Sequence, residues 1–213
     1  MDELKVEPIV FNGISGEIRT SLITPSGTNG KLAVVLPGAG YSCRQPLLYF
    51  AIQALLAKRL TVLQVDKVYG EDPKWANLST MEEALAVVKD DSVRFFDQIS
   101  KRFPERIDIL LGRSLGTYAI ACALEKQVIH PKKIVWQTPS LNDKWSAIKA
   151  SNVDGFAIIG TADPRFKEAL PYLPKDRIVI EYADHAMEIP GKPLQSIEIL
   201  KTVTEAMDKW VGH

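Results

Sequence analysis

The sequence predicts an α/β protein with a mostly parallel, twisted sheet, an antiparallel hairpin at its N-terminus and helices on both faces. With 213 residues, 46% hydrophobic and 24% charged, the chain has the composition of a globular protein and the length for one domain over 1–213. Short apolar runs of strand length alternate with segments of helical period. Such alternation is typical of parallel strands joined by crossover helices.

The first two strands are expected to form the hairpin. The segments 5–12 and 16–24 flank the turn signal Asn12-Gly13, which favours a tight antiparallel connection. After a break rich in glycine and serine, the run Leu32–Leu36 is apolar throughout, as expected of a strand that is buried on both faces.

The remaining elements are expected to alternate. Ser79, three residues before Glu82, has the spacing of a capping box and predicts a helix start. Strands are expected at 60–65, 106–111, 133–136, 156–159 and 177–182, and helices at 46–58, from 79 onward, at 115–125, at about 143–150 and at 194–211. The apolar stripes expected to face the core are Met81, Leu85, Val88, Phe95 and Ile99 in one helix, and Leu194, Ile197, Leu200, Val203, Met207 and Trp210 in the last.

One motif suggests chemistry. The segment 112–116, Gly-Arg-Ser-Leu-Gly, joins a predicted strand directly to a predicted helix. In a G-x-S-x-G elbow the serine lies on a sharp turn with its hydroxyl exposed, and the glycines let the helix pass close to the strand. The five letters alone also fit a plain turn. The strand before and the unbroken helix after them favour Ser114 as a nucleophile.

A serine hydroxyl needs a base to take its proton, and a histidine is the usual one. His130 precedes a proline in a loop that is expected at the opposite edge of the sheet, and His213 ends the chain. His185 follows the last predicted strand, where a loop can carry it to Ser114. We therefore expect His185 to be the base.

The base needs a carboxylate that holds its tautomer. Asp163 lies just past the strand 156–159 and gives the order Ser…Asp…His. Asp184 is an alternative because it adjoins His185, although adjacent side chains seldom face each other. Asp66, at an earlier strand end, is a further alternative.

An acyl-transfer site also needs two N–H groups for the developing oxyanion. Leu115, directly after the nucleophile, is expected to supply one. The glycine-rich loop after Leu36 is expected to supply the other, from Ala39 or, if the loop turns differently, from Gly40 or Tyr41.

A dinucleotide site is the competing interpretation of the same loop. Gly38-Ala39-Gly40 opens a strand–turn–helix unit, and Asp66 ends the next strand, as in that fingerprint. However, Cys43 stands where the third glycine belongs, a hairpin comes first, and the serine, aspartate and histidine would be left unexplained.

With these motifs the sequence resembles the α/β-hydrolase family from Leu32 to His213. The resemblance implies Ser114, Asp163 and His185 as nucleophile, acid and base, with Ala39 and Leu115 as oxyanion donors. Pro37 departs from the histidine of many members. A cap domain usually enters after the strand following the elbow helix, and here only 137–154 are available. The chain is thus similar to small lidless members, the dienelactone-hydrolase-like and acyl-thioesterase-like ones, with serine in place of the cysteine of dienelactone hydrolases.

The substrate is harder to predict. Tyr41, Tyr69 and Trp75 lie in loops at strand ends and could wall an acyl pocket, or they could pack on the surface. Arg113, beside the nucleophile, either packs and pairs locally or favours an anionic substrate.

These observations predict a serine hydrolase that cleaves a carboxylic ester of a small or medium acyl group, with no metal or organic cofactor. The alternatives are a thioesterase or amidase, or a hydrolase-fold binding protein without turnover.

Lys+Arg and Asp+Glu both number 26, so the net charge gives no argument for binding nucleic acid. No apolar run is long enough to span a membrane. Two cysteines indicate no disulfide framework, so a cytoplasmic location is expected. The expected partner is a small-molecule ester or thioester, and the oligomeric state stays open.

Overall fold

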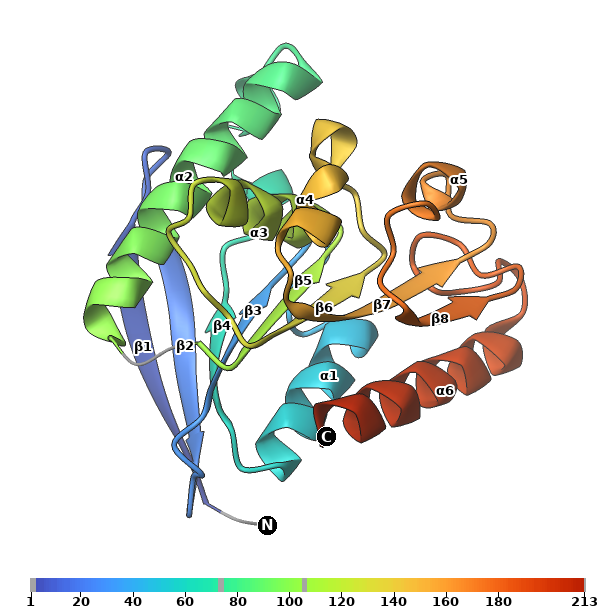
Figure 1. Ribbon diagram of the computed structural model, residues 1–213, viewed down its shortest axis with the longest axis horizontal. Helices are drawn as coiled ribbons and strands as arrows, with labels where there is room; N and C mark the ends of the chain where they lie inside the picture. Colours follow the sequence, from blue (N-terminus) through green and yellow to red (C-terminus); the bar gives the residue numbers. More distant parts are fainter. Residues whose placement is uncertain (1–2, 73–74, 105–106, 213) are drawn as a thin grey trace.

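An eight-stranded sheet runs through the centre of the computed structural model, which describes residues 3–72, 75–104 and 107–212 (Figure 1). The strand order is β1-β2-β4-β3-β5-β6-β7-β8. The hairpin strands pair antiparallel with each other and β2 with β4, and all other pairs are parallel. The strands are β1 (Leu4–Asn12), β2 (Glu17–Pro25), β3 (Leu32–Leu36), β4 (Thr61–Val65), β5 (Ile109–Arg113), β6 (Lys133–Gln137), β7 (Asp154–Gly160) and β8 (Asp176–Ile180).

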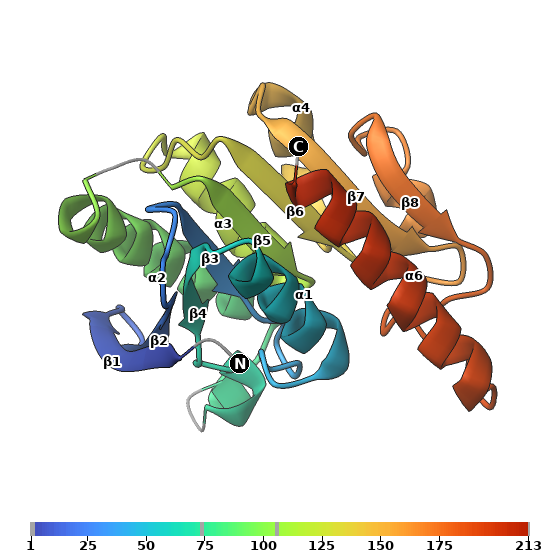
Figure 2. The same cartoon turned by 90° about the horizontal axis from the view of Figure 1, so that it is seen from below.

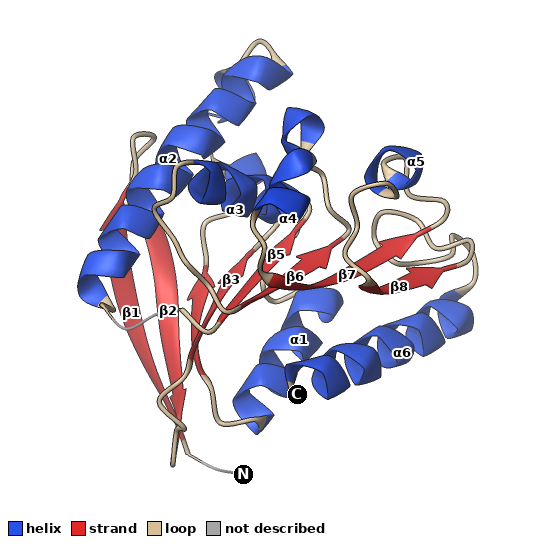
Figure 3. Cartoon of the chain, viewed as in Figure 1, coloured by secondary structure: helices blue, strands red, loops and turns tan. Residues whose placement is uncertain are grey.

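Helices cover both faces of this sheet (Figures 2 and 3). On one face α1 (Pro46–Ala57) packs beside α6 (Pro193–Val211). On the other face α3 (Leu115–Glu125) packs between α2 (Met81–Arg102) and α4 (Ser146–Ala150). The sheet separates two apolar cores because its side chains alternate between the faces. Short helical turns complete the chain: η1 (Tyr69–Glu71), η2 (Trp75–Asn77), η3 (Asn142–Lys144) and α5 (Phe166–Ala169).

β3 and β5 are neighbours in the sheet, and the chain leaves them in opposite directions, from β3 toward β4 and from β5 toward β6. From β3 the chain runs through α1 to β4 on one side, and α2 then crosses to β5 on the other side. Such a switch leaves a crevice at the carboxyl ends of the two strands. The register pairs Leu36, at the end of β3, with Gly112 of β5. The loop after β3 and the elbow after β5 therefore start side by side.

The predicted fold class is confirmed, with corrections at element ends. Thr80, not Ser79, caps α2, since its side chain accepts from Glu83 N at 3.1 Å while Ser79 N donates to Glu83 Oε2 at 2.8 Å. β8 ends at Ile180 and not at Tyr182, whose φ of 62° is incompatible with a strand. Arg106, the expected start of a strand, and His213 lie outside the described residues.

The predicted apolar stripes of α2 and α6 are buried in the later turns of each helix and exposed at its start. Met81 is 67% exposed, Leu194 78% and Ile197 59%, whereas Val88, Phe95, Val203 and Met207 are buried. The first turns of α6 reach past the edge of the sheet, where no strand covers them (Figure 2). Helical period alone does not reveal where the sheet ends.

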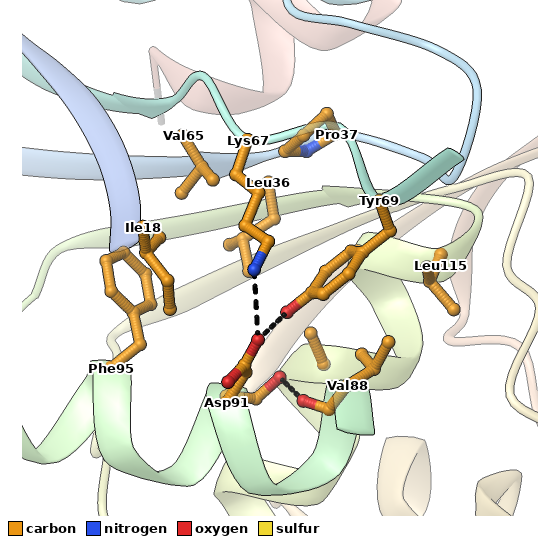
Figure 4. Close-up of a pocket in the computed structure, with 13 residues that line it drawn as sticks. Ile18, Leu36, Pro37, Val65, Lys67, Tyr69, Val88, Asp91, Phe95 and Leu115 are labelled. Carbon is orange, nitrogen blue, oxygen red and sulfur yellow. Dashed lines mark hydrogen bonds and ion pairs between the residues drawn. The ribbon is translucent and has the colours of Figure 1, made fainter. Parts of the chain in front are cut away.

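A buried carboxylate, Asp91, anchors the hairpin to the rest of the fold, and Figure 4 shows its contacts with Lys67 and Tyr69. Asp91, on the inner face of α2, has no solvent exposure and accepts from the N–H groups of Ile14 and Ser15 at 2.6 and 2.9 Å. It also accepts from Lys67 Nζ at 3.3 Å and from Tyr69 Oη at 3.1 Å. Burial raises the pKa of Asp91, but the hydrogen bonds from Ser15 and the charge of Lys67 outweigh it and leave that pKa below its ordinary value.

We expect Asp91→Ala to lower the free energy of unfolding by about 3–5 kcal/mol at pH 7, because it leaves Lys67 without its buried partner. Since the pKa of Asp91 is lowered in the folded state, the wild type should lose this stabilisation only as the pH falls from about 4 downward, and the variant should lack that loss. Urea denaturation between pH 7 and pH 2.5 measures both. Asp90→Ala, at the exposed neighbouring position, is the matched control, and equal stability of the two variants would contradict the anchor.

Candidate active site

Ser114 lies at the turn between β5 and α3 with φ 51° and ψ −114°, a sparsely populated region for a residue with a side chain. Two glycines make the turn possible. A Cβ on Gly116 would lie 2.5 Å from the carbonyl oxygen of Leu36, and one on Gly112 would lie 2.8 Å from that of Gly116. Ser114 N donates to the carbonyl oxygen of Gln137 on β6 at 3.0 Å. Ser114 is held at the carboxyl edge of the sheet and is partly exposed.

His185 reaches Ser114 from the loop after β8. Its Nε2 lies 2.8 Å from Ser114 Oγ, and its Nδ1 lies 2.7 Å from Asp163 Oδ2. The Asp163 side chain is fully buried, whereas the imidazole is 34% exposed. Asp163 Oδ1 accepts from the N–H of Arg165 at 2.8 Å, which orients the carboxylate. With the proton on Nδ1 donated to Asp163, Nε2 can accept the serine proton.

The other candidates for these two roles lie elsewhere. Asp184 Oδ1 accepts from the N–H groups of Ala186 and Glu188 at 2.8 and 3.0 Å, so it shapes the histidine loop from within. Asp66 accepts from Ser21 Oγ at 2.7 Å on the hairpin side of the sheet. His130 is exposed in the loop between α3 and β6. Of the three carboxylates weighed, Asp163 is the one that contacts His185.

A third glycine, which was not among the predicted site residues, lets the loops of Asp163 and His185 meet. Gly160 ends β7, and a Cβ there would overlap the carbonyl oxygen of Ala183. The N–H of Ala162 donates to that same oxygen at 3.0 Å, and the N–H of Thr161 donates to Ile180 at 2.9 Å. The available signal was a glycine at a strand end, three residues before the aspartate.

The loop after β3 forms a closed turn beside the elbow. Gly38 N donates to the carbonyl oxygen of Tyr41 at 3.0 Å, and Ala39 O accepts from the N–H of Gly70 at 2.7 Å. The N–H groups of Ala39 and of Leu115, the first residue of α3, have no acceptor among the described residues. The N-terminus of α3 adds its partial positive charge at this point.

The aromatic and basic residues predicted near the site are largely engaged by the protein. Arg113 is 7% exposed, and its guanidinium lies 4.1 Å from the centre of the Tyr41 ring. Tyr41 Oη accepts from Leu47 N at 2.9 Å. The centres of the Tyr69 and Trp75 rings lie 5.3 Å apart, so these two side chains pack on each other.

A small cavity lies behind the elbow (Figure 4). Its walls are mostly apolar and include Leu36, Val88, Leu115 and Ala119, with Tyr69 at one side. The volume of this cavity is about 30 Å³. A cavity of this volume can hold about two water molecules, and it is too small for a long acyl chain.

The carboxyl edge of the sheet is not covered by an inserted domain. Between β6 and β7 the described chain holds only η3 and α4, and α4 turns Ala147 and Ile148 into the core. The described residues include no group of three or more His, Cys, Asp and Glu side chains that could hold a metal ion. None of the helices in the described ranges is both long and apolar enough to cross a membrane.

No protein-family model and no curated protein matches this sequence. Solved structures match along almost the full chain. A dienelactone hydrolase from Anabaena variabilis is 18% identical, with a TM-score of 0.74 over 99% of this chain and 98% of its own. A serine hydrolase without a lid from Xanthomonas campestris is 16% identical, with a TM-score of 0.67 over 97% and 95%. The naproxen esterase of Bacillus subtilis is 12% identical, with a TM-score of 0.60 over 93% and 92%. At these identities the likeness shows a shared fold.

We expect Gly160→Ala to lower the free energy of unfolding by about 2–3 kcal/mol, because the added methyl group must push the backbone of Ala183 away. Gly40→Ala is the matched control, since nothing lies within 4 Å of a Cβ at Gly40, and it should change stability by less than about 0.5 kcal/mol. Urea denaturation of both variants measures the difference. Similar stabilities for the two would refute the proposed close approach at Gly160.

Proposed function

We propose that this chain, whose fold is that of the lidless α/β-hydrolases, is a serine hydrolase that cleaves a carboxylic ester through an acyl-enzyme. The observation that carries the proposal is the unbroken hydrogen-bonded series from Ser114 through His185 to Asp163, at 2.8 and 2.7 Å. The two ends of this series differ in environment as the chemistry requires, because the carboxylate of Asp163 is buried and Ser114 is partly exposed. The serine hydrolase and esterase among the structural neighbours support the same reaction class.

In the first step Ser114 Oγ forms a bond to the carbonyl carbon while its proton moves to His185 Nε2. The carbonyl π electrons move to oxygen, and the N–H groups of Leu115 and Ala39 stabilise that oxyanion. Each such donor contributes on the order of 10²–10³ in rate. The negative charge of Asp163 stabilises the imidazolium that forms.

In the second step the oxyanion collapses and the bond to the leaving oxygen breaks as His185 gives its proton to that oxygen. The alcohol departs and leaves an ester on Ser114. A water molecule then attacks the carbonyl carbon of this acyl-enzyme while His185 takes a proton from the water. The second tetrahedral intermediate collapses, the bond to Ser114 Oγ breaks, and His185 returns the proton to Ser114 Oγ. The products are one alcohol and one carboxylic acid, and the enzyme is unchanged. The open carboxyl edge gives water the access that this step needs.

We expect Ser114→Ala to lower kcat by roughly four to six orders of magnitude while the melting temperature stays unchanged. A panel of p-nitrophenyl esters and acyl-thioesters of graded chain length measures the loss and shows which leaving group and acyl length are preferred. Ser100→Ala, on α2 away from the elbow, is the matched control and should keep full activity.

A fluorophosphonate probe tests the nucleophile without a chosen substrate. It should label the wild type and Ser100→Ala on one serine, and it should not label Ser114→Ala. A wild type that hydrolyses no ester and takes no label would support a binding protein of this fold instead. Turnover of thioesters alone would keep the mechanism and change the leaving group to a thiol.

A further inference from the structure

Arg113 carries a charge into an apolar layer of the protein. Along β5 the side chains of Ile109 and Leu111 face the core beneath α1 and α6, and Arg113 continues that row because alternate strand residues share a face. It is only 7% exposed. Burying a guanidinium costs free energy unless its environment compensates for the lost water.

The guanidinium contacts two loops beside the one that carries it. Arg113 Nη2 donates to the carbonyl oxygen of His185 at 3.0 Å. Its Cζ lies 4.1 Å from the centre of the Tyr41 ring, and a Cβ added to Gly38 would lie 2.8 Å from Nη1. Gly38 and Tyr41 close the turn that presents Ala39, through the hydrogen bond from Gly38 N.

Arg113 stays charged in spite of its burial. Burial lowers the pKa of Arg113 below its ordinary value, and Tyr41 and the nearby carboxylates of Asp163 and Asp184 offset only part of this. An arginine side chain remains a cation under such conditions. The guanidinium lies over the Tyr41 ring while Nη2 donates to the carbonyl oxygen of His185, and a lysine ammonium has no planar group to stack on the ring in the same way.

We infer that Arg113 is a positioning residue, which holds the backbone of His185 and the turn of Gly38 to Tyr41 at a set distance from Ser114. This inference rests on the proposed function, since it assigns what the bracing does for catalysis. Nucleophile, base and oxyanion turn come from three separate loops, and Arg113 precedes the nucleophile directly. A displacement of about 1 Å among reacting groups costs on the order of 10² in rate. Since the guanidinium is buried against protein atoms, it is not a binding group for an anionic substrate.

The test compares Arg113→Met, Arg113→Lys and the control Arg44→Met, at an exposed position close to the same loop. For Arg113→Met we expect kcat to fall by roughly 10- to 100-fold with KM changed by less than about threefold, because the groups that bind and the groups that react are displaced differently. Arg113→Lys should recover part of kcat. Amide hydrogen exchange by mass spectrometry should rise in the segments 38–41 and 183–188, and Arg44→Met should resemble the wild type in every readout.

Tyr41→Leu serves if Arg113→Met does not fold, because it removes the stacking surface and keeps the charge, and Tyr41→Phe keeps the ring as its control. Tyr41→Leu should lower kcat and raise amide exchange in the segment 183–188. Tyr41→Phe should raise that exchange less. A rise in KM at unchanged kcat would assign Arg113 to substrate binding and overturn the inference. Exchange that is unchanged in both segments, or that rises equally across the chain, would also overturn it. Because exchange needs no turnover, a wild type without activity or labelling would refute the proposed function while this measurement still decides the bracing.

Discussion

The architecture of the site depends on the backbone contact between the first turn of α3 and the end of β3. A Cβ on Gly116 would lie within 2.5 Å of the carbonyl oxygen of Leu36, so only a glycine allows the two elements to meet. This contact brings the first turn of α3 against the backbone of Leu36 and Pro37, directly after Ser114 with its positive φ of 51°. Such a conformation costs about 1–3 kcal/mol and persists only where its surroundings hold it. Here the neighbouring strand does so through the bond from Ser114 N to Gln137.

The proposed base is held by a second contact of the same kind. Gly160 lets the backbone of Ala183 lie directly on the end of β7, and this brings the loops of Asp163 and His185 together. Both contacts exclude side chains from the space between backbones. The distances among Ser114, His185 and Asp163 are therefore set by main-chain packing at strand ends, and the side chains of Asp163 and His185 span only the remaining gap.

Buried charges add a further layer of support around these contacts. Asp91 joins the hairpin, α2 and the loop after β4 through the N–H groups of Ser15 and Ile14 and the side chain of Lys67. Arg113 joins the elbow to two more loops. Each charge has directional partners, which apolar side chains of similar size would lack. We interpret both as groups that select one arrangement of loops. Hydrogen bonds and an ion pair offset the desolvation cost at Asp91, whereas at Arg113 one hydrogen bond and the Tyr41 ring offset part of it.

The sequence alone determined the order of strands and helices, the elbow at Ser114 and the position of His185 after the last strand. These features are local, since they follow from apolar period, from glycine spacing and from the scarcity of histidine. Only the tertiary structure decided that Asp163 and not Asp184 contacts His185, that Arg113 is buried, and that Leu194 and Ile197 are exposed. It also revealed Gly160 and Asp91, which the sequence analysis passed over. Each of these depends on segments far apart in the chain, and their mutual distance is set by the packing of the sheet and not by the residues beside them.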